Sequence, residues 1–134
     1  MPGMTHDTIA EFGAGYCVID IHSLFVCATL KDEILVLGAG DALFADLKTD
    51  ALSFGFVPDR GRRLDSYSGG EQAILCCLLL MRLLPRDPLQ IMLVRVLETL
   101  SPKNRELLLL KFATMLPAAT LFTLTPSGPR AIHA

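Results

Sequence analysis

The pattern of hydrophobic and polar positions changes near the middle of this chain. In the first half, short apolar runs rich in β-branched and aromatic residues alternate with turn residues, a pattern typical of β-strands. The strands predicted on this basis are Tyr16–Ile21, Leu24–Leu30, Ile34–Leu37 and Ala51–Val57. We therefore expect residues 16–57 to form a β-rich N-terminal part, with a short helix at Asp41–Leu47, after a loose leader over residues 1–15.

In the second half the apolar runs are longer and predict helices that alternate with strands. Glu71–Leu84 is apolar nearly all round, which indicates a helix buried on several sides. Gln90–Val94 has the composition and length of a fully buried strand. A second helix is expected to begin with Ser101 as its N-cap and Pro102 in its first position, and to end near Leu116.

The alternation of elements predicts the fold class. A last strand is expected at Thr120–Leu124, and residues 127–134 are expected to form a tail. Strands separated by helices run parallel and are joined by right-handed crossovers. We therefore expect an α/β fold with a partly parallel sheet and flanking helices. At 134 residues, the chain has the size of a single domain.

Composition and charge exclude several classes of protein. Apolar residues make up 51% of the chain and the net charge is only −2, so no overall field would attract nucleic acid or an acidic membrane. The longest apolar run, Ala73–Met81, is too short to cross a bilayer. The N-terminus lacks the basic and apolar regions of a signal peptide. We expect a cytoplasmic protein, nuclear in a eukaryote, without a membrane partner.

Cysteines and histidines give no sign of a metal site. The cysteines lie inside apolar runs without C-x-x-C spacing, which indicates buried, reduced thiols. They are Cys17, Cys27, Cys76 and Cys77. The histidines are scattered, so no metal ligand is predicted. A local basic cluster, Arg60, Arg62 and Arg63, is flanked by aspartates, and a solvated loop is its favoured interpretation.

The most informative segment is Ser68-Gly69-Gly70-Glu71-Gln72. A serine and two glycines before a long apolar run describe a tight loop that leads into a helix. The free N–H groups and positive dipole end of such a helix can hold an anion, and glycines let a phosphate approach closely. In a purely structural interpretation, Ser68 is an N-cap and Glu71 completes a capping box. The motif alone leaves both interpretations open.

The wider pattern resembles the C-terminal part of ABC-type ATPase heads, especially the SMC/RecF-like branch. In that family a glycine-basic segment precedes the signature loop, as Arg60–Gln72 does in this chain. A buried helix, a hydrophobic strand with Walker B acids, the D-loop and another helix follow. Val96–Arg105 is similar to the family's passage from strand to D-loop, with Leu100, Ser101 and Asn104 as D-loop-like residues. The resemblance covers residues 58–126 and implies the fold of the signature and Walker B half of such a head.

The departures from the family pattern concern catalysis. Val94 stands where the Walker B aspartate should hold Mg²⁺, and Arg95 stands where the water-activating glutamate should follow. Valine has no lone pair for a metal, and arginine cannot act as a general base near neutral pH. Ser101 replaces the D-loop aspartate, and Pro126 replaces the switch histidine. The sequence contains no G-x-x-x-x-G-K-[ST] motif, so we expect no catalytic residue and no hydrolysis by this chain alone.

The resemblance therefore implies two alternative functions. The first is a non-catalytic pseudo-ATPase subunit that acts as a protein-interaction scaffold with a P-loop ATPase or a second copy of the chain. A DNA-maintenance complex is implied only by family analogy. In the second, Ser68–Gln72 completes in trans an ATP site held by a P-loop partner, and only then is ATP a cofactor. The loss of neighbouring motifs, and Tyr67 in place of the usual leucine, favour the scaffold.

A weaker candidate lies in the first half of the chain. Ile34–Asp41 is similar to the opening of a dinucleotide-binding turn, in which a strand is followed by G-x-G. The third glycine of that motif is missing, because Leu43 occupies its position. A plain strand-to-turn interpretation is favoured, and small-molecule binding through Gly38–Gly40 is the remaining alternative.

Overall fold

A computed structural model describes residues 15–132 of the chain. Over this range the protein has an α/β fold with a four-stranded mixed sheet and four α-helices. The chain divides into two compact units. The first combines the described residues up to Ile21 with those from Pro85 onward, and the second spans His22–Leu84.

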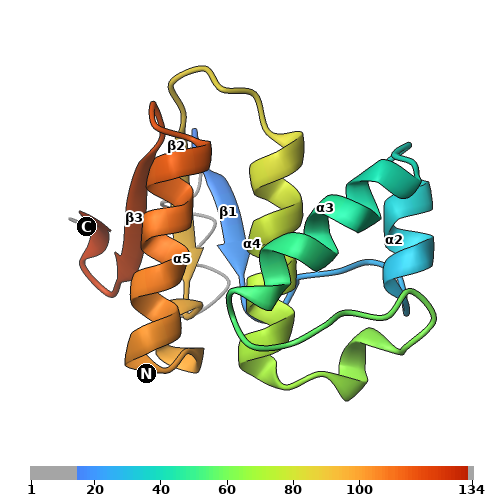
Figure 1. The fold of residues 1–134 in the computed structure, drawn as a ribbon. Coiled ribbons are helices and arrows are strands. Elements are labelled where there is room, and N and C mark those ends of the chain that lie inside the picture. Colours follow the sequence, from blue (N-terminus) through green and yellow to red (C-terminus); the bar gives the residue numbers. More distant parts are fainter. Residues whose placement is uncertain (1–14, 133–134) are drawn as a thin grey trace. The chain divides into compact units, whose positions relative to one another are not determined.

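The first unit contains the whole sheet. Its strands lie in the order β1 (Cys17–Asp20), β2 (Gln90–Val94), β3 (Thr120–Thr125) and β4 (Gly128–Ala131). The strands β1, β2 and β3 run parallel, and β4 pairs with β3 in the antiparallel direction (Figure 1). The predicted partly parallel sheet is thus confirmed.

The core of the first unit is built on β2. Residues Ile91–Val94 are at most 2% exposed, as expected of an inner strand that is apolar on both faces. Met92, Val94 and Leu124 form a buried cluster, against which Tyr16 and Val18 pack. The helix α5 (Pro102–Met115) packs beside β3, where Phe112 shares a small cavity of about 160 Å³ with residues at the start of that strand.

The second unit is helical. It contains α2 (Leu30–Val36), α3 (Asp41–Leu52) and α4 (Gly69–Leu83), and α3 packs against α4. The two helices are joined by Arg82, which donates from Nε and Nη2 to the carboxylate of Asp50, both at 3.0 Å. Asp50 is 5% exposed, and its hydrogen bond to Arg82 raises the pKa of that guanidinium. The buried carboxylate is therefore compensated by a bidentate pair.

Helix α4 confirms the all-round apolar pattern of its sequence. All seven residues from Ala73 to Leu79 are buried, together with Met81. The helix begins two residues before the predicted start at Glu71. It ends at Leu83, shortly before Pro85, which has no N–H for a further helical hydrogen bond.

The β-rich interpretation of residues 16–57 was wrong beyond its first strand. The predicted strand at Tyr16–Ile21 is confirmed as β1. The predicted strand at Leu24–Leu30 is irregular apart from an isolated bridge at Thr29, and its last residue, Leu30, begins α2. Ile34–Leu37 lies mostly in α2, and Ala51–Val57 begins inside α3. Only helices therefore follow β1 within residues 16–57.

Local hydrogen bonds explain why this segment turns into a helix. The Thr29 hydroxyl caps α2 by accepting from the N–H of Asp32 at 3.3 Å. The buried Glu33 carboxylate reaches back and accepts from the N–H groups of Val26 at 3.3 Å and Cys27 at 2.8 Å. The backbone groups that a strand would offer to a sheet are used within the turn instead.

The other helices and strands differ from their predicted boundaries by a few residues. The helix predicted at Asp41–Leu47 runs on to Leu52, and Gly55, with φ +90°, lies in the turn that follows. The strands at Gln90–Val94 and Thr120–Leu124 are confirmed, the second with Thr125 added. The tail interpretation was wrong where β4 forms. The predicted leader lies outside the described residues, except for Gly15.

Candidate functional site

The signature-like turn forms a complete capping box at the start of α4. The Ser68 Oγ accepts from the N–H of Glu71 at 3.1 Å, and the Glu71 carboxylate accepts from the N–H of Ser68 at 3.0 Å. The structural interpretation of this motif is thus confirmed. It accounts for the position of both polar side chains without a ligand.

The two glycines of the turn, unlike Ser68 and Glu71, take no part in the capping hydrogen bonds. The N–H groups of Gly69 and Gly70 meet no hydrogen-bond acceptor within residues 15–132. A Cβ added to Gly69 would contact no other atom within 4 Å, and its φ is not positive. Neither packing nor backbone conformation therefore requires glycine at position 69.

Tyr67 anchors the loop that leads into α4. Its ring is 3% exposed, and its hydroxyl donates to the carbonyl of Asp59 at 3.2 Å while accepting from the N–H of Asp59 at 2.9 Å. The Gln72 side-chain amide donates to the Tyr67 carbonyl at 3.0 Å. Tyr67 thus connects the turn at Asp59 to the loop before α4, and Gln72 connects that loop to the helix.

The arginines of the basic cluster are held by neighbours on the same unit. The Arg62 guanidinium lies 4.0 Å above the Tyr67 ring and donates from Nε to the Ser66 hydroxyl at 2.8 Å. Arg63 pairs with Asp65, and this hydrogen bond lowers the pKa of the Asp65 carboxyl. Both side chains of that pair are 68% exposed, so it adds little to stability. Arg60 pairs with Asp41 instead.

The end of β2 carries neither of the acids expected of an ATPase. Val94 is 2% exposed and belongs to the apolar cluster of the sheet. Arg95 has φ +60°, the one positive φ of a non-glycine residue between Gly15 and Ile132. Ligands of α/β proteins bind at this carboxyl edge of the strands, and costly backbone conformations concentrate at functional sites. In the parallel pairing of β1 with β2, the residue in register with Val94 is Asp20, which carries a carboxylate.

The D-loop-like residues form an ordinary helix start in the first unit. Ser101 is the N-cap of α5 and accepts from the N–H of Asn104 at 3.2 Å, while Leu100 is buried. Ser68–Gln72 belongs to the second unit. Each group therefore lies at the N-terminus of its own helix.

In the described part of the chain, no three or more His, Cys, Asp or Glu residues are placed to hold a metal ion. No helix within residues 15–132 has the length and apolar character needed to cross a membrane. All four cysteines lie within the described residues and form no disulfide there. Cys76 and Cys77 are buried as predicted, whereas Cys17 and Cys27 are only half-buried. Burial raises the pKa of the Cys17 thiol.

The structure contradicts the strand that was predicted before the dinucleotide-like turn. Ile34–Val36 lies in a helix, so the strand that this motif requires is missing. Ala39 and Gly40 nevertheless line a pocket of about 480 Å³ together with Lys31 and Arg60. The sequence gives no sign of this pocket, because its residues come from three separate segments and no spacing in the sequence connects them.

The comparisons with known proteins leave the family open. The chain matches no model of a known protein family, and a comparison with curated proteins finds no significant match. The resemblance to ABC/SMC-type heads stays a prediction that depends on the residues named above.

Proposed function

We propose that this chain is a non-catalytic, ABC/SMC-like subunit that serves as a scaffold for a protein partner. The observation that carries the proposal is the end of β2. A buried valine occupies the position of the metal-binding acid, and an arginine occupies the position of the general base. Neither side chain can hold Mg²⁺ or activate water.

The closed capping box supports the same proposal. Ser68 and Glu71 use their side chains on each other's N–H groups. The Glu71 carboxylate also places a negative charge at the positive end of the helix dipole, where a phosphate would bind. A nucleotide would have to displace this carboxylate or bind beside it against its charge.

An exposed apolar surface on α2 supports a protein partner. Leu35, Val36 and Leu37 follow one another and are 71%, 67% and 46% exposed. Large exposed apolar patches on a folded protein mark interaction sites, and these three side chains would contribute to one. By resemblance, the partner is a P-loop ATPase or a second copy of the chain. A role in DNA maintenance follows from family analogy alone.

One observation favours the second candidate, a composite ATP site completed in trans. Gly69 is a poor residue for a helix, and the fold gives no reason for it, since a side chain would fit there. A phosphate that closely approaches the unpaired N–H groups of Gly69 and Gly70 would be a reason for glycine at position 69.

The two candidates are separated by ATP turnover of the native assembly. The assembly is purified through a tag on the full-length chain, once with the wild type and once with the Ser68→Arg variant. ATP hydrolysis and protein content are measured for each assembly. A matched control, Ser53→Arg, adds the same side chain at an exposed position after α3. The scaffold predicts that both variants retain the partner and the wild-type turnover. Loss of turnover in Ser68→Arg alone, with the partner retained, contradicts the scaffold and supports the composite site.

A further inference from the structure

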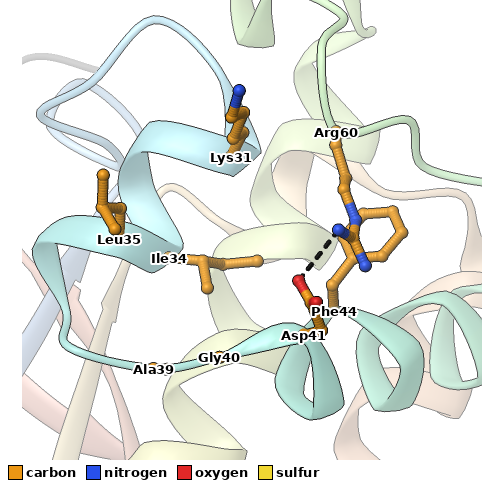
Figure 2. A pocket seen from close by; sticks show the side chains of 8 residues that line it. All are labelled: Lys31, Ile34, Leu35, Ala39, Gly40, Asp41, Phe44 and Arg60. Atoms are coloured by element: carbon orange, nitrogen blue, oxygen red, sulfur yellow. Dashed lines mark hydrogen bonds and ion pairs between the residues drawn. The ribbon is translucent and has the colours of Figure 1, made fainter.

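A pocket of about 480 Å³ lies in the second unit, between α2 and the start of α3 (Figure 2). Its volume falls within the roughly 300–1,000 Å³ of typical small-molecule sites. Ile34 and Phe44 are buried and face the cavity, and Leu35 lines it while remaining 71% exposed. The wall is therefore largely apolar, with one large apolar side chain left in contact with solvent.

Arg60 is held in place at this pocket by contacts on each side. Its guanidinium lies 4.5 Å above the Phe44 ring and donates from Nη1 to Asp41 Oδ1 at 2.9 Å. Its carbonyl accepts from the N–H of Lys31 at 3.1 Å, which ties the loop to the start of α2. A guanidinium has five N–H donors, and the pair with Asp41 uses one of them. A positioned cation with unused donors is suited to a carboxylate or sulfonate.

Lys31 adds a second cation at the edge of the same pocket. Within residues 15–132, no carboxylate lies close enough to form an ion pair with its ammonium group. The lining residues carry two cations and one carboxylate, Asp41, so one positive charge is left uncompensated. The first turn of α3 also begins at the pocket, and its N-cap, Gly40, offers no side-chain acceptor to that turn.

We propose that this pocket binds a small organic monoanion with an apolar body. The anionic group lies against Arg60 and Lys31, and the apolar body packs on Ile34, Leu35 and Phe44. The single uncompensated charge selects a monoanion, and the apolar wall selects a hydrocarbon or aromatic body over a sugar. This inference uses none of the residues of the signature-like turn, but it shares Leu35 with the apolar surface proposed above for the protein partner. The test below therefore substitutes Arg60 and Lys31, which that surface does not include.

The test uses a matched pair of fluorescent probes on the full-length chain. Anilinonaphthalene sulfonate is a monoanion with an aromatic body, and phenylnaphthylamine has nearly the same body without the charge. Both are titrated against the wild type, Arg60→Gln, Lys31→Met and the control Lys48→Met, which removes an exposed lysine of α3 outside the pocket. Circular dichroism and thermal melting verify that each variant is folded, because the anionic probe also binds partly unfolded chains.

The proposal predicts saturable binding of the sulfonate with one probe per chain. Loss of the Arg60 charge weakens this binding about tenfold, the equivalent of one charge-assisted hydrogen bond. Lys31→Met weakens it by a smaller factor, Lys48→Met leaves it unchanged, and the neutral probe binds at least about tenfold more weakly to the wild type. Three results overturn the proposal: no saturable binding of the sulfonate, equal binding of the two probes, or sulfonate binding that neither Lys31→Met nor Arg60→Gln reduces.

Discussion

Ser68 and Glu71 exchange two hydrogen bonds across the first turn of α4, and neither bond needs another part of the chain. This pair is where the two interpretations of the signature-like motif diverge. A cap gives an acceptor to backbone N–H groups that have none within the helix, whereas a ligand site leaves these N–H groups unpaired until a phosphate binds. The neighbouring Gly69 is open to solvent and tolerates a methyl group, so the two roles can be tested separately.

Replacement of Ser68 by alanine should lower the free energy of unfolding by about 1 kcal/mol, because the N–H of Glu71 loses its acceptor. Chemical denaturation measures the change. The exposed turn residue Ser127 provides the control, and Ser127→Ala should change stability by less than about 0.5 kcal/mol. Equal stability of the Ser68→Ala variant and the wild type would mean that the capping box contributes nothing.

The Cys17 thiol gives a prediction about pH. Burial raises its pKa above the ordinary value of 9.0 in the folded protein. As the pH rises through that value, the unfolded thiol loses its proton first, so this contribution to stability is complete below it and is lost above it. The wild type should therefore lose stability between neutral and alkaline pH more steeply than Cys17→Ala. Parallel pH profiles of the two proteins, measured by denaturation, would contradict the assignment.

Strand β2 is the element at whose end the ABC/SMC resemblance predicts catalytic acids, and it ends in Val94 instead. Its residues pair with β1 and β3 in a parallel sheet, and Val94 closes the apolar cluster at the edge where a catalytic strand would present an acid. The backbone at Arg95 still adopts a rare conformation directly after the strand. The strand is therefore followed by a residue with a rare backbone conformation, and Val94 at its end serves packing.

An acid at position 94 should damage the fold. Val94→Asp places a carboxylate at a site that is 2% exposed and should cost about 3 kcal/mol of unfolding free energy. The matched variant Val94→Ile keeps the apolar character and should cost less than about 1.5 kcal/mol. Denaturation of both variants tests the difference. A stable Val94→Asp protein would show that the edge of the sheet is open to solvent and able to accept a charge.

The elements that the sequence predicted best are those with strong local signals. Gln90–Val94 is a continuous apolar run, and Ser101 with Pro102 is a specific helix start, so β2 and α5 appear where they were expected. The helix at Leu30–Val36 was mistaken for strands because short apolar runs do not distinguish the two structures. Its one local signal, Thr29 three residues before Asp32, is a capping pattern that could have been recognised.

Other features required contacts that no local pattern contains. The strand β4 depends on pairing with β3 across the short turn at Ser127, and Gly128 takes φ +121° there. Arg60 meets Asp41 and Phe44 only because the loop before α4 returns to the start of α3. The capping box was predictable from Ser68 and Glu71 alone, since both partners lie within one helical turn.

On the scale of the whole molecule, the proposed function depends on contact with another protein. Leu35 and Val36 at the end of α2, and Leu37 directly after it, are exposed apolar residues of the unit that also carries the signature-like turn. The sheet unit contributes the β2 edge, where the chemistry of an ATPase is missing. Partner binding is therefore expected to respond to substitutions on α2 rather than to substitutions at the end of β2.

Charges on α2 should release the partner. The double substitution Leu35→Glu and Val36→Glu adds two negative charges to the exposed apolar surface, and we expect the native assembly to lose at least about tenfold in affinity. Leu52→Glu, at the exposed end of α3, serves as the control and should bind as the wild type does. Co-purification with quantitative mass spectrometry measures the loss. Full retention of the partner by the double variant would exclude α2 as the interface.

The most direct test of the scaffold is the ATP turnover of the native assembly with Gly69→Ala in the full-length chain. Alanine leaves the capping box in place and adds only a methyl group where a phosphate would have to approach. The scaffold predicts that the variant assembly and the wild-type assembly hydrolyse ATP at the same rate, including the case in which neither does. A fall in turnover of about tenfold or more, with the partner still bound, would show that the turn contacts nucleotide and would contradict the account.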